Sequence, residues 1–233
     1  MVDSSTCFTS KDIAIPDNIE LCQEQAWEPL AYSILFEHIK ICRKLGECVP
    51  PSALNNLLRD MLGYSRPKAK AAIDFMIKRN IFEEKDGAID FGNYYEHGYV
   101  KLSCGTLNYF LTRYPKDTMA IKLYNRLLHW HTLSRVGGWS GPYKFCIGGS
   151  NKNSLLHQIG YNSISARNRD KAANILNQLI EDGLITCSNP QKETNFGRVI
   201  GSYRTLISVN QYGNDEFEGD MKWQLVPSQP HDR

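Results

Sequence analysis

The sequence predicts a mainly α-helical chain with small β-hairpins, an α+β fold in which one arrangement of three helices and a hairpin occurs twice in tandem. Apolar residues recur at helical spacing along much of the chain, which predicts the helices. Asp86-Gly87, between two short runs of strand-forming residues, is typical of a hairpin turn. Both halves contain a pair of leucines followed by a Gly-Tyr turn, at Gly63-Tyr64 and at Gly160-Tyr161. This repetition predicts two units of the same kind.

The first unit begins with a predicted helix over 29–45, whose apolar stripe ends at the terminator Gly46. Pro50-Pro51-Ser52 then supplies a break and a helix start, and 53–62 follows as the second helix. After the Gly63-Tyr64 turn, Ser65 can cap a third helix that ends near residue 80. Residues 81–91 then predict two short strands joined by a tight turn.

The second unit repeats this order. We expect a long helix over 117–136, a short strand over 143–147, a helix over 150–159, a helix over 167–182 and a strand over 183–186. A polar loop over 189–202 and a strand over 203–209 complete a longer hairpin. Helix, helix, turn, helix and hairpin is the order of a winged-helix unit, a form of helix-turn-helix. We therefore expect an acidic flexible arm over 1–28, winged-helix domains over 29–98 and 99–212, and an acidic tail over 213–233.

The net charge of +2 conceals a strongly uneven distribution. Residues 1–30 contain one lysine and six acidic residues, and residues 213–233 contain two basic and five acidic residues. The body between them, 31–212, has 24 basic and 14 acidic residues, an excess of ten positive charges. A basic body favours binding to a polyanion, and the acidic ends could be solvating arms or could compete for its surface.

Several classes of protein are disfavoured. No apolar run approaches the roughly 18 residues of a membrane span, and Met1-Val2-Asp3 does not open a secretory leader, so we expect a cytoplasmic protein with no membrane partner. Seven scattered cysteines favour free thiols packed in the core. His129 and His131 point to different sides of a helix and do not suit one metal ion. Nucleotide-loop and hydrolase motifs are absent, so we expect no enzyme, catalytic residue, metal or cofactor.

In a helix-turn-helix unit the helix after the turn enters the major groove of DNA. The first unit offers three basic residues there, and the second adds arginines and amides that can read base edges as well as phosphates. Exposed helix faces are also often basic for solubility alone. Lys85 is the sole basic residue of the short first wing. The candidate DNA contacts are Arg66, Lys68 and Lys70 in the first unit, Asn162, Ser163, Ser165, Arg167, Asn168, Arg169 and Lys171 in the second, and Lys192, Arg198 and Arg204 on the second wing.

A second basic run, from Lys101 to Lys144, is interleaved with aromatic residues such as Tyr109, Tyr124 and Trp130. This pattern is typical of single-stranded nucleic-acid binding, but Tyr124 and Trp130 also fall near the apolar face of a long helix. We favour a core role for these rings.

With its two Gly-Tyr turns and helix exits at Asn80-Ile81 and Gly183-Leu184, the chain resembles the tandem winged-helix replication initiators and replisome organisers of plasmids and phages. The resemblance covers roughly residues 30–210 and implies sequence-specific binding to a duplex origin or operator. It leaves a homodimer open, and the terminal arms are left for replication proteins. The very short first wing departs from this pattern, and no separate helicase-loading domain is evident. A winged-helix transcriptional regulator of a mobile element, and a protein-interaction module or inhibitor on the same scaffold, remain alternatives.

Overall fold

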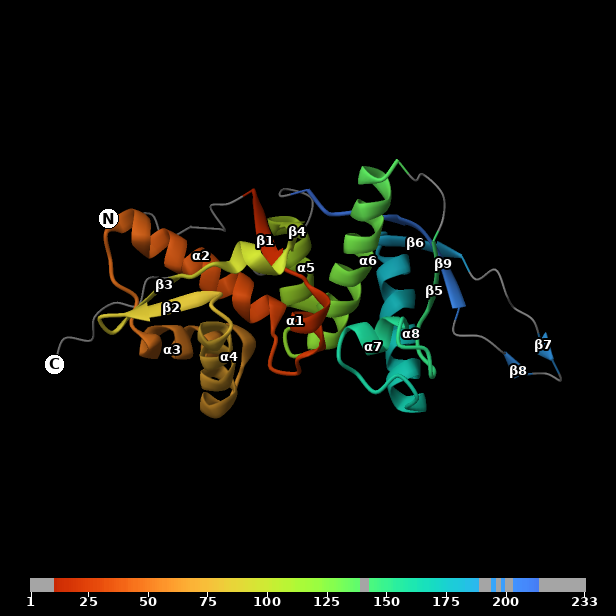
Figure 1. Cartoon of the computed structure of the whole chain (residues 1–233), viewed down its shortest axis with the longest axis horizontal. Helices are drawn as coiled ribbons and strands as arrows, with labels where there is room; N and C mark the ends of the chain where they lie inside the picture. Colours follow the sequence, from red (N-terminus) through yellow and green to blue (C-terminus); the bar gives the residue numbers. More distant parts are fainter. Residues whose placement is uncertain (1–10, 139–142, 189–193, 196–197, 200–202, 214–233) are drawn as a thin grey trace. The chain divides into compact units, whose positions relative to one another are not determined.

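The computed structural model describes residues 11–138, 143–188, 194–195, 198–199 and 203–213. Helices predominate, and the strands form small antiparallel sheets of two or three members (Figure 1). The predicted mixture of helices with small β-hairpins is confirmed. Within the described part of the chain, every helix is too short or too polar to cross a bilayer.

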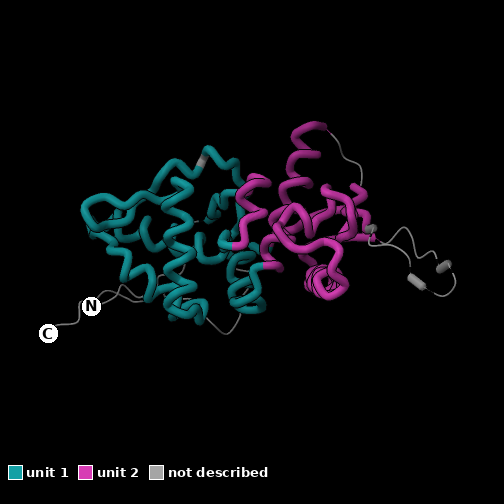
Figure 2. The backbone as a smooth tube through the Cα atoms, turned by 60° about the horizontal axis from the view of Figure 1, so that its bottom comes forward, with its two compact units in different colours: residues 1–16, 26–118, 212–233 teal, residues 17–25, 119–211 magenta. Residues whose placement is uncertain are grey.

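The chain divides into two compact units, coloured separately in Figure 2. Unit 1 comprises Met1–Pro16, Ala26–Thr118 and Tyr212–Arg233, and unit 2 comprises Asp17–Gln25 and Met119–Gln211. The expected boundary at residues 98 and 99 therefore differs from the observed one after Thr118. Neither unit is one continuous stretch, because residues 17–25 belong to unit 2 and the residues from Tyr212 onward belong again to unit 1.

Unit 1 contains the predicted order of elements. Helices α2 (Pro29–Leu45), α3 (Pro51–Leu62) and α4 (Arg66–Lys78) precede the hairpin of β2 (Phe82–Lys85) and β3 (Ala88–Phe91). Asp86 and Gly87 have φ values of 51° and 76°, as a tight hairpin turn requires. The N–H of Ile89 donates to the carbonyl of Val49 at 2.8 Å, which ties the α2–α3 connection to the hairpin. In the core, the rings of Tyr32 and Phe82 stack at 5.7 Å.

A second sheet in unit 1 was not predicted. Strand β1 (Asp12–Pro16) pairs antiparallel with β4 (Tyr99–Ser103), and the 3-10 helix η1 (Tyr94–His97) and helix α5 (Cys104–Arg113) flank β4. Ile13 and Ile15 of β1 are fully buried. The expectation of a flexible arm over 1–28 is therefore wrong for residues 12–28, because the acidic composition of this segment masked an apolar alternation that fits a half-buried strand. Residues 1–10 lie outside the described part.

Unit 2 also contains a three-helix arrangement with a sheet. It consists of α6 (Thr118–Val136), β5 (Tyr143–Cys146), α7 (Leu155–Gln158), α8 (Ala166–Glu181), β6 (Ile185–Ser188) and β9 (Tyr203–Val209), and the strand order is β5-β9-β6. The short strands β7 (Thr194–Asn195) and β8 (Arg198–Val199) pair with each other. The helix expected over 150–159 is shorter than predicted. The Asn151 side chain accepts a bond from the Asn153 N–H at 2.8 Å, and this turn delays the helix to Leu155.

The segment of residues 17–25, with the short helix α1 (Ile19–Gln23), is anchored in unit 2 by a buried ionic cluster. The Asp17 carboxylate, 1% exposed, lies 3.2 Å from Arg126 Nη1 and 3.2 Å from His129 Nδ1, and it accepts a bond from Cys22 Sγ. Lys122 Nζ donates to the carbonyls of Cys22 and Glu24 at 3.1 and 2.8 Å, at the C-terminal end of α1. The acidic arm thus supplies the counter-charge for a basic helix.

Four of the described cysteines are buried, as the sequence predicted for thiols in the core: Cys22, Cys42, Cys104 and Cys146. Cys187 is half-buried and Cys48 is exposed. Burial raises the pKa of the Cys42 thiol, which keeps it protonated.

Candidate nucleic-acid interface

The turn before α8 is held by polar side chains that the sequence had suggested for DNA contact. Asn162 Oδ1 accepts bonds from the backbone N–H groups of Ile164 and Ser165 at 3.0 and 3.3 Å. Ser165 Oγ in turn accepts from the Asn168 N–H at 3.4 Å and caps α8. These bonds fix the start of α8.

Two further candidates also serve this turn. Ser163 is buried, and its hydroxyl donates to the carbonyl of Gly149 at 2.7 Å. Asn168 Nδ2 donates to the carbonyl of Asn162 at 3.0 Å. Asn162, Ser163, Ser165 and Asn168 are therefore positioning residues of the turn, and each has a side-chain atom hydrogen-bonded to the backbone.

Three basic residues remain on the exposed surface of the first turns of α8: Arg167, Arg169 and Lys171. A Cβ added at Gly148 would lie 2.7 Å from Arg169 Cγ, so the aliphatic part of Arg169 packs closely over the Gly148 backbone. Arg167 has no ion-pair partner among the described residues. An exposed, unpaired guanidinium near a helix N-terminus has the reach for bidentate contacts to phosphate or guanine.

The second wing is only partly described. Arg204 on β9 donates to Asn177 Oδ1 of α8 at 3.4 Å, so this side chain lies beside the helix. Arg198 belongs to β8, and Lys192 falls outside the described residues.

In unit 1 the three predicted residues at the start of α4 are all exposed, but they differ in their surroundings. Lys68 forms an ion pair with buried Glu28 at 3.2 Å and lies over the Tyr64 ring at 3.9 Å from its centroid. Glu28 also accepts from the hydroxyls of Tyr64 and Thr118, so Lys68 completes a structural cluster.

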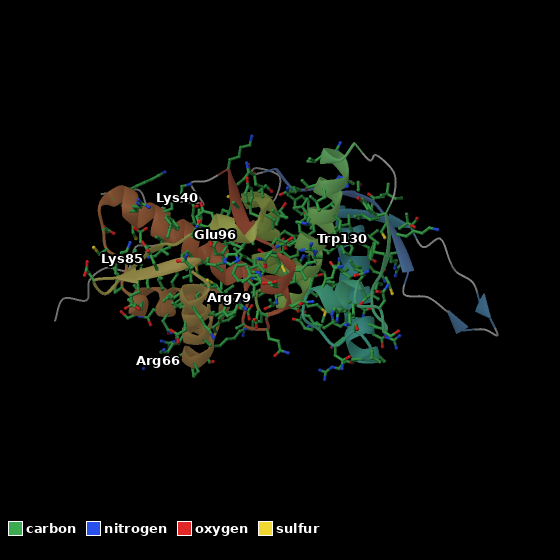
Figure 3. All side chains as sticks on the ribbon, viewed as in Figure 1. Lys40, Arg66, Arg79, Lys85, Glu96 and Trp130 are labelled. Carbon is green, nitrogen blue, oxygen red and sulfur yellow. The ribbon has the colours of Figure 1, made fainter. Side chains whose placement is uncertain are left out.

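The other two basic residues of α4 are less constrained. Lys70 pairs with Asp74 at 2.6 Å, an exposed contact between residues four apart that contributes little to stability. Arg66 has no ion-pair partner among the described residues and is labelled at the start of α4 in Figure 3. Unit 1 thus presents one arginine without an ion pair where α8 presents three exposed basic residues.

The hairpin tip of unit 1 is acidic. It contains Glu83, Glu84 and Asp86, and Lys85, labelled in Figure 3, is its one basic residue. Lys85 Nζ donates to Glu83 Oε1 at 2.6 Å, and this bond raises the pKa of the lysine. A tip of this charge repels phosphates, so in unit 1 the hairpin is poorly suited to DNA contact.

In the run from Lys101 to Lys144 several of the rings lie in the core, as the sequence favoured, whereas most of the basic residues are exposed. Tyr109, Tyr124, Lys122 and Arg126 are buried. Trp130 is only half-buried and is the exception among these residues.

Within the described residues, no group of three or more His, Cys, Asp or Glu side chains is placed to hold a metal ion. Comparison with known proteins finds no matching family model, no matching curated protein and no matching solved structure.

Proposed function

We propose that both units are winged helices and that the chain is a sequence-specific double-stranded DNA-binding protein. The exposed basic residues at the start of α8 are the observation on which the proposal rests: Arg167 and Lys171 lie one turn apart on the same face, and Arg169 lies on a different face, over Gly148. The strand order β5-β9-β6, with the strand before α7 at the sheet edge, supports the winged-helix assignment of unit 2. In unit 1 the hydrogen bond from the Ile89 N–H to the Val49 carbonyl joins the α2–α3 connection to the hairpin, and this link supports the same assignment.

We base the proposed biological role on the resemblance of the sequence to tandem winged-helix proteins. We propose replication initiation on a plasmid or phage, with origin DNA as the ligand. A transcriptional regulator of a mobile element is the alternative, and it would require a dimer and a palindromic site with half-sites one helical turn apart.

A protein-binding role for unit 1 has one specific observation in its favour. The acidic hairpin tip around Glu83, Glu84 and Asp86 suits a basic protein surface better than DNA. In this arrangement unit 2 binds DNA and unit 1 binds a partner in the replication or regulatory complex.

The first experiment measures the affinity of the full chain for random duplex DNA across a salt series, followed by selection of preferred sequences. We expect affinity to fall steeply with salt and one duplex motif to be enriched. Arg167→Ala should then cost about 1–3 kcal/mol on the selected site and relax preference at one position. Lys70→Ala should weaken all sequences alike.

Arg135→Ala is the matched control, because Arg135 is exposed on α6 and belongs to neither helix start. It should leave the enriched motif unchanged. Equal effects of Arg167→Ala and Arg135→Ala on every sequence would exclude base reading by Arg167. Absence of duplex binding at low salt would overturn the proposal and leave the protein-interaction alternative.

A further inference from the structure

A small cavity lies along one edge of the three-stranded sheet in unit 2. It has a volume of about 370 Å³ and is lined by residues of α6, β5, α7 and the loop before α7. All four residues of β5 line it, although successive side chains of a strand point to opposite faces. The cavity must therefore follow the strand edge, and β5 is an edge strand in the described sheet. Its volume is near the lower limit of small-molecule sites, roughly 300–1,000 Å³.

Aromatic rings form one side of this cavity. Trp130 of α6, labelled in Figure 3, faces Phe145 of β5 with 6.1 Å between ring centroids, and Tyr143 adds a third ring. Trp130 and Tyr143 are each half-buried, so part of each ring is open to solvent. Such rings bind flat, conjugated molecules by stacking.

Polar groups of two kinds complete the lining. Gln158 is 9% exposed, and its Oε1 has no hydrogen-bond partner among the described residues, while its Nε2 donates to the Asn153 carbonyl at 3.3 Å. A buried acceptor without a donor is costly, so a rotation of the amide that brings Oε1 to a ligand N–H in the cavity is favoured. The exposed side chain of Lys144 supplies a positive charge that suits an anionic group.

We propose that this cavity binds a nucleotide. The base stacks on Trp130, an N–H group on its edge donates to Gln158 Oε1, and the phosphate pairs with the Lys144 ammonium. The site contains no residue of α8, so it goes beyond the proposed duplex contact. The nucleotide has two possible sources with the same chemistry, a free mononucleotide and an unpaired nucleotide in a single strand of DNA.

Calorimetric titration of the full chain with adenosine monophosphate and with a single-stranded oligodeoxyadenylate tests the proposal. We expect saturable binding of at least one of the two ligands. Trp130→Leu should weaken it between about fivefold and a hundredfold, the range of one base–aromatic stack. Trp130→Phe keeps a ring and should restore most of the affinity. Because these changes touch the Phe145 contact, folding is checked by circular dichroism.

A pair of lysine variants tests the site without disturbing the core. Lys144 and Lys152 are both exposed, but Lys152 does not line the cavity. Lys144→Ala should weaken binding by more than about threefold, whereas Lys152→Ala should leave it unchanged. Inorganic phosphate alone should bind far more weakly than the monophosphate, because it cannot stack.

The result also distinguishes the two sources. Binding of the monophosphate identifies a free-nucleotide site, and Trp130-dependent binding of the oligonucleotide alone identifies an unpaired base. Absence of binding by both, or binding that is indifferent to Trp130→Leu and Lys144→Ala, would overturn the proposal. Arg167→Ala should leave monophosphate binding intact, so failure of the duplex proposal and failure of this one give different results.

Discussion

Replacing Asp17 by Asn tests whether the buried ionic cluster holds the N-terminal segment in unit 2. Asn has nearly the same shape, but it removes the negative charge that Arg126, 3% exposed, contacts at 3.2 Å. Arg126 Nε already lacks a hydrogen-bond partner among the described residues. Removing one member of such a buried pair costs about 3–5 kcal/mol, since the remaining charge is left without compensation. For a unit of about 100 residues this loss lowers the melting temperature by at least about 12 °C.

Urea unfolding of the full chain measures this loss, with Asp12→Asn as the control because Asp12 is exposed on β1. The control should change the free energy of unfolding by less than about 0.5 kcal/mol. The double variant Asp17→Asn, Arg126→Met removes both charges and should recover much of the loss. A cost below about 1 kcal/mol for Asp17→Asn, or no coupling in the double variant, would refute the structural role of the cluster.

Three further outcomes follow from particular contacts. Gly160→Ala should destabilise the chain by about 1–3 kcal/mol more than Gly183→Ala. Both glycines have positive φ, but only at Gly160 would the new Cβ lie 2.0 Å from a carbonyl oxygen of α1. Thermal denaturation compares the two variants, and equal losses of stability would contradict the close approach. Burial lowers the pKa of His38 below 6.5, so the unfolded chain takes up the proton first and stability decreases as pH falls below about 6.5. His38→Gln should flatten this part of the stability–pH curve, and an unchanged slope between pH 7.5 and 5.5 would argue against it. Ser103→Ala removes the cap of α5 and a 2.6 Å bond to the carbonyl of Tyr212. It should lower the free energy of unfolding in urea by about 1–2 kcal/mol. A loss below about 0.3 kcal/mol would show that water replaces both bonds.

The local sequence pattern was sufficient to predict helices and strands that begin and end at residues such as proline and glycine. Helix α2 begins at Pro29 and ends before Gly46, which has φ of 73°, as the sequence predicted. Strand β1 was missed because its partner β4 lies far along the chain. A single short strand with two buried isoleucines cannot be told from an exposed arm when no local residue pairs with it.

The position of the candidate site could be predicted from the sequence, but the role of each of its side chains could not. Basic and amide residues at the start of α8 were identified from the turn that precedes them. Some of these side chains hold the turn through hydrogen bonds to the backbone, as Asn162 and Ser163 do. The spacing of residues in the sequence does not specify such bonds. Gln158 was not predicted, because an unpaired amide is recognisable only from its neighbours in the fold.

The interleaved course of the chain sets an order of events during synthesis. α1 leaves the ribosome early, but its contact from Lys122 to Cys22 needs a residue 100 positions later. The hydrogen bond from Ser103 to the carbonyl of Tyr212 forms later still, because Tyr212 lies 109 residues further along the chain. Until those segments appear, the Cys22 carbonyl lacks its lysine and Ser103 lacks the Tyr212 carbonyl, so neither unit can complete its fold. Such late, long-range closure predicts slow folding that is completed only after residue 212 has been synthesised.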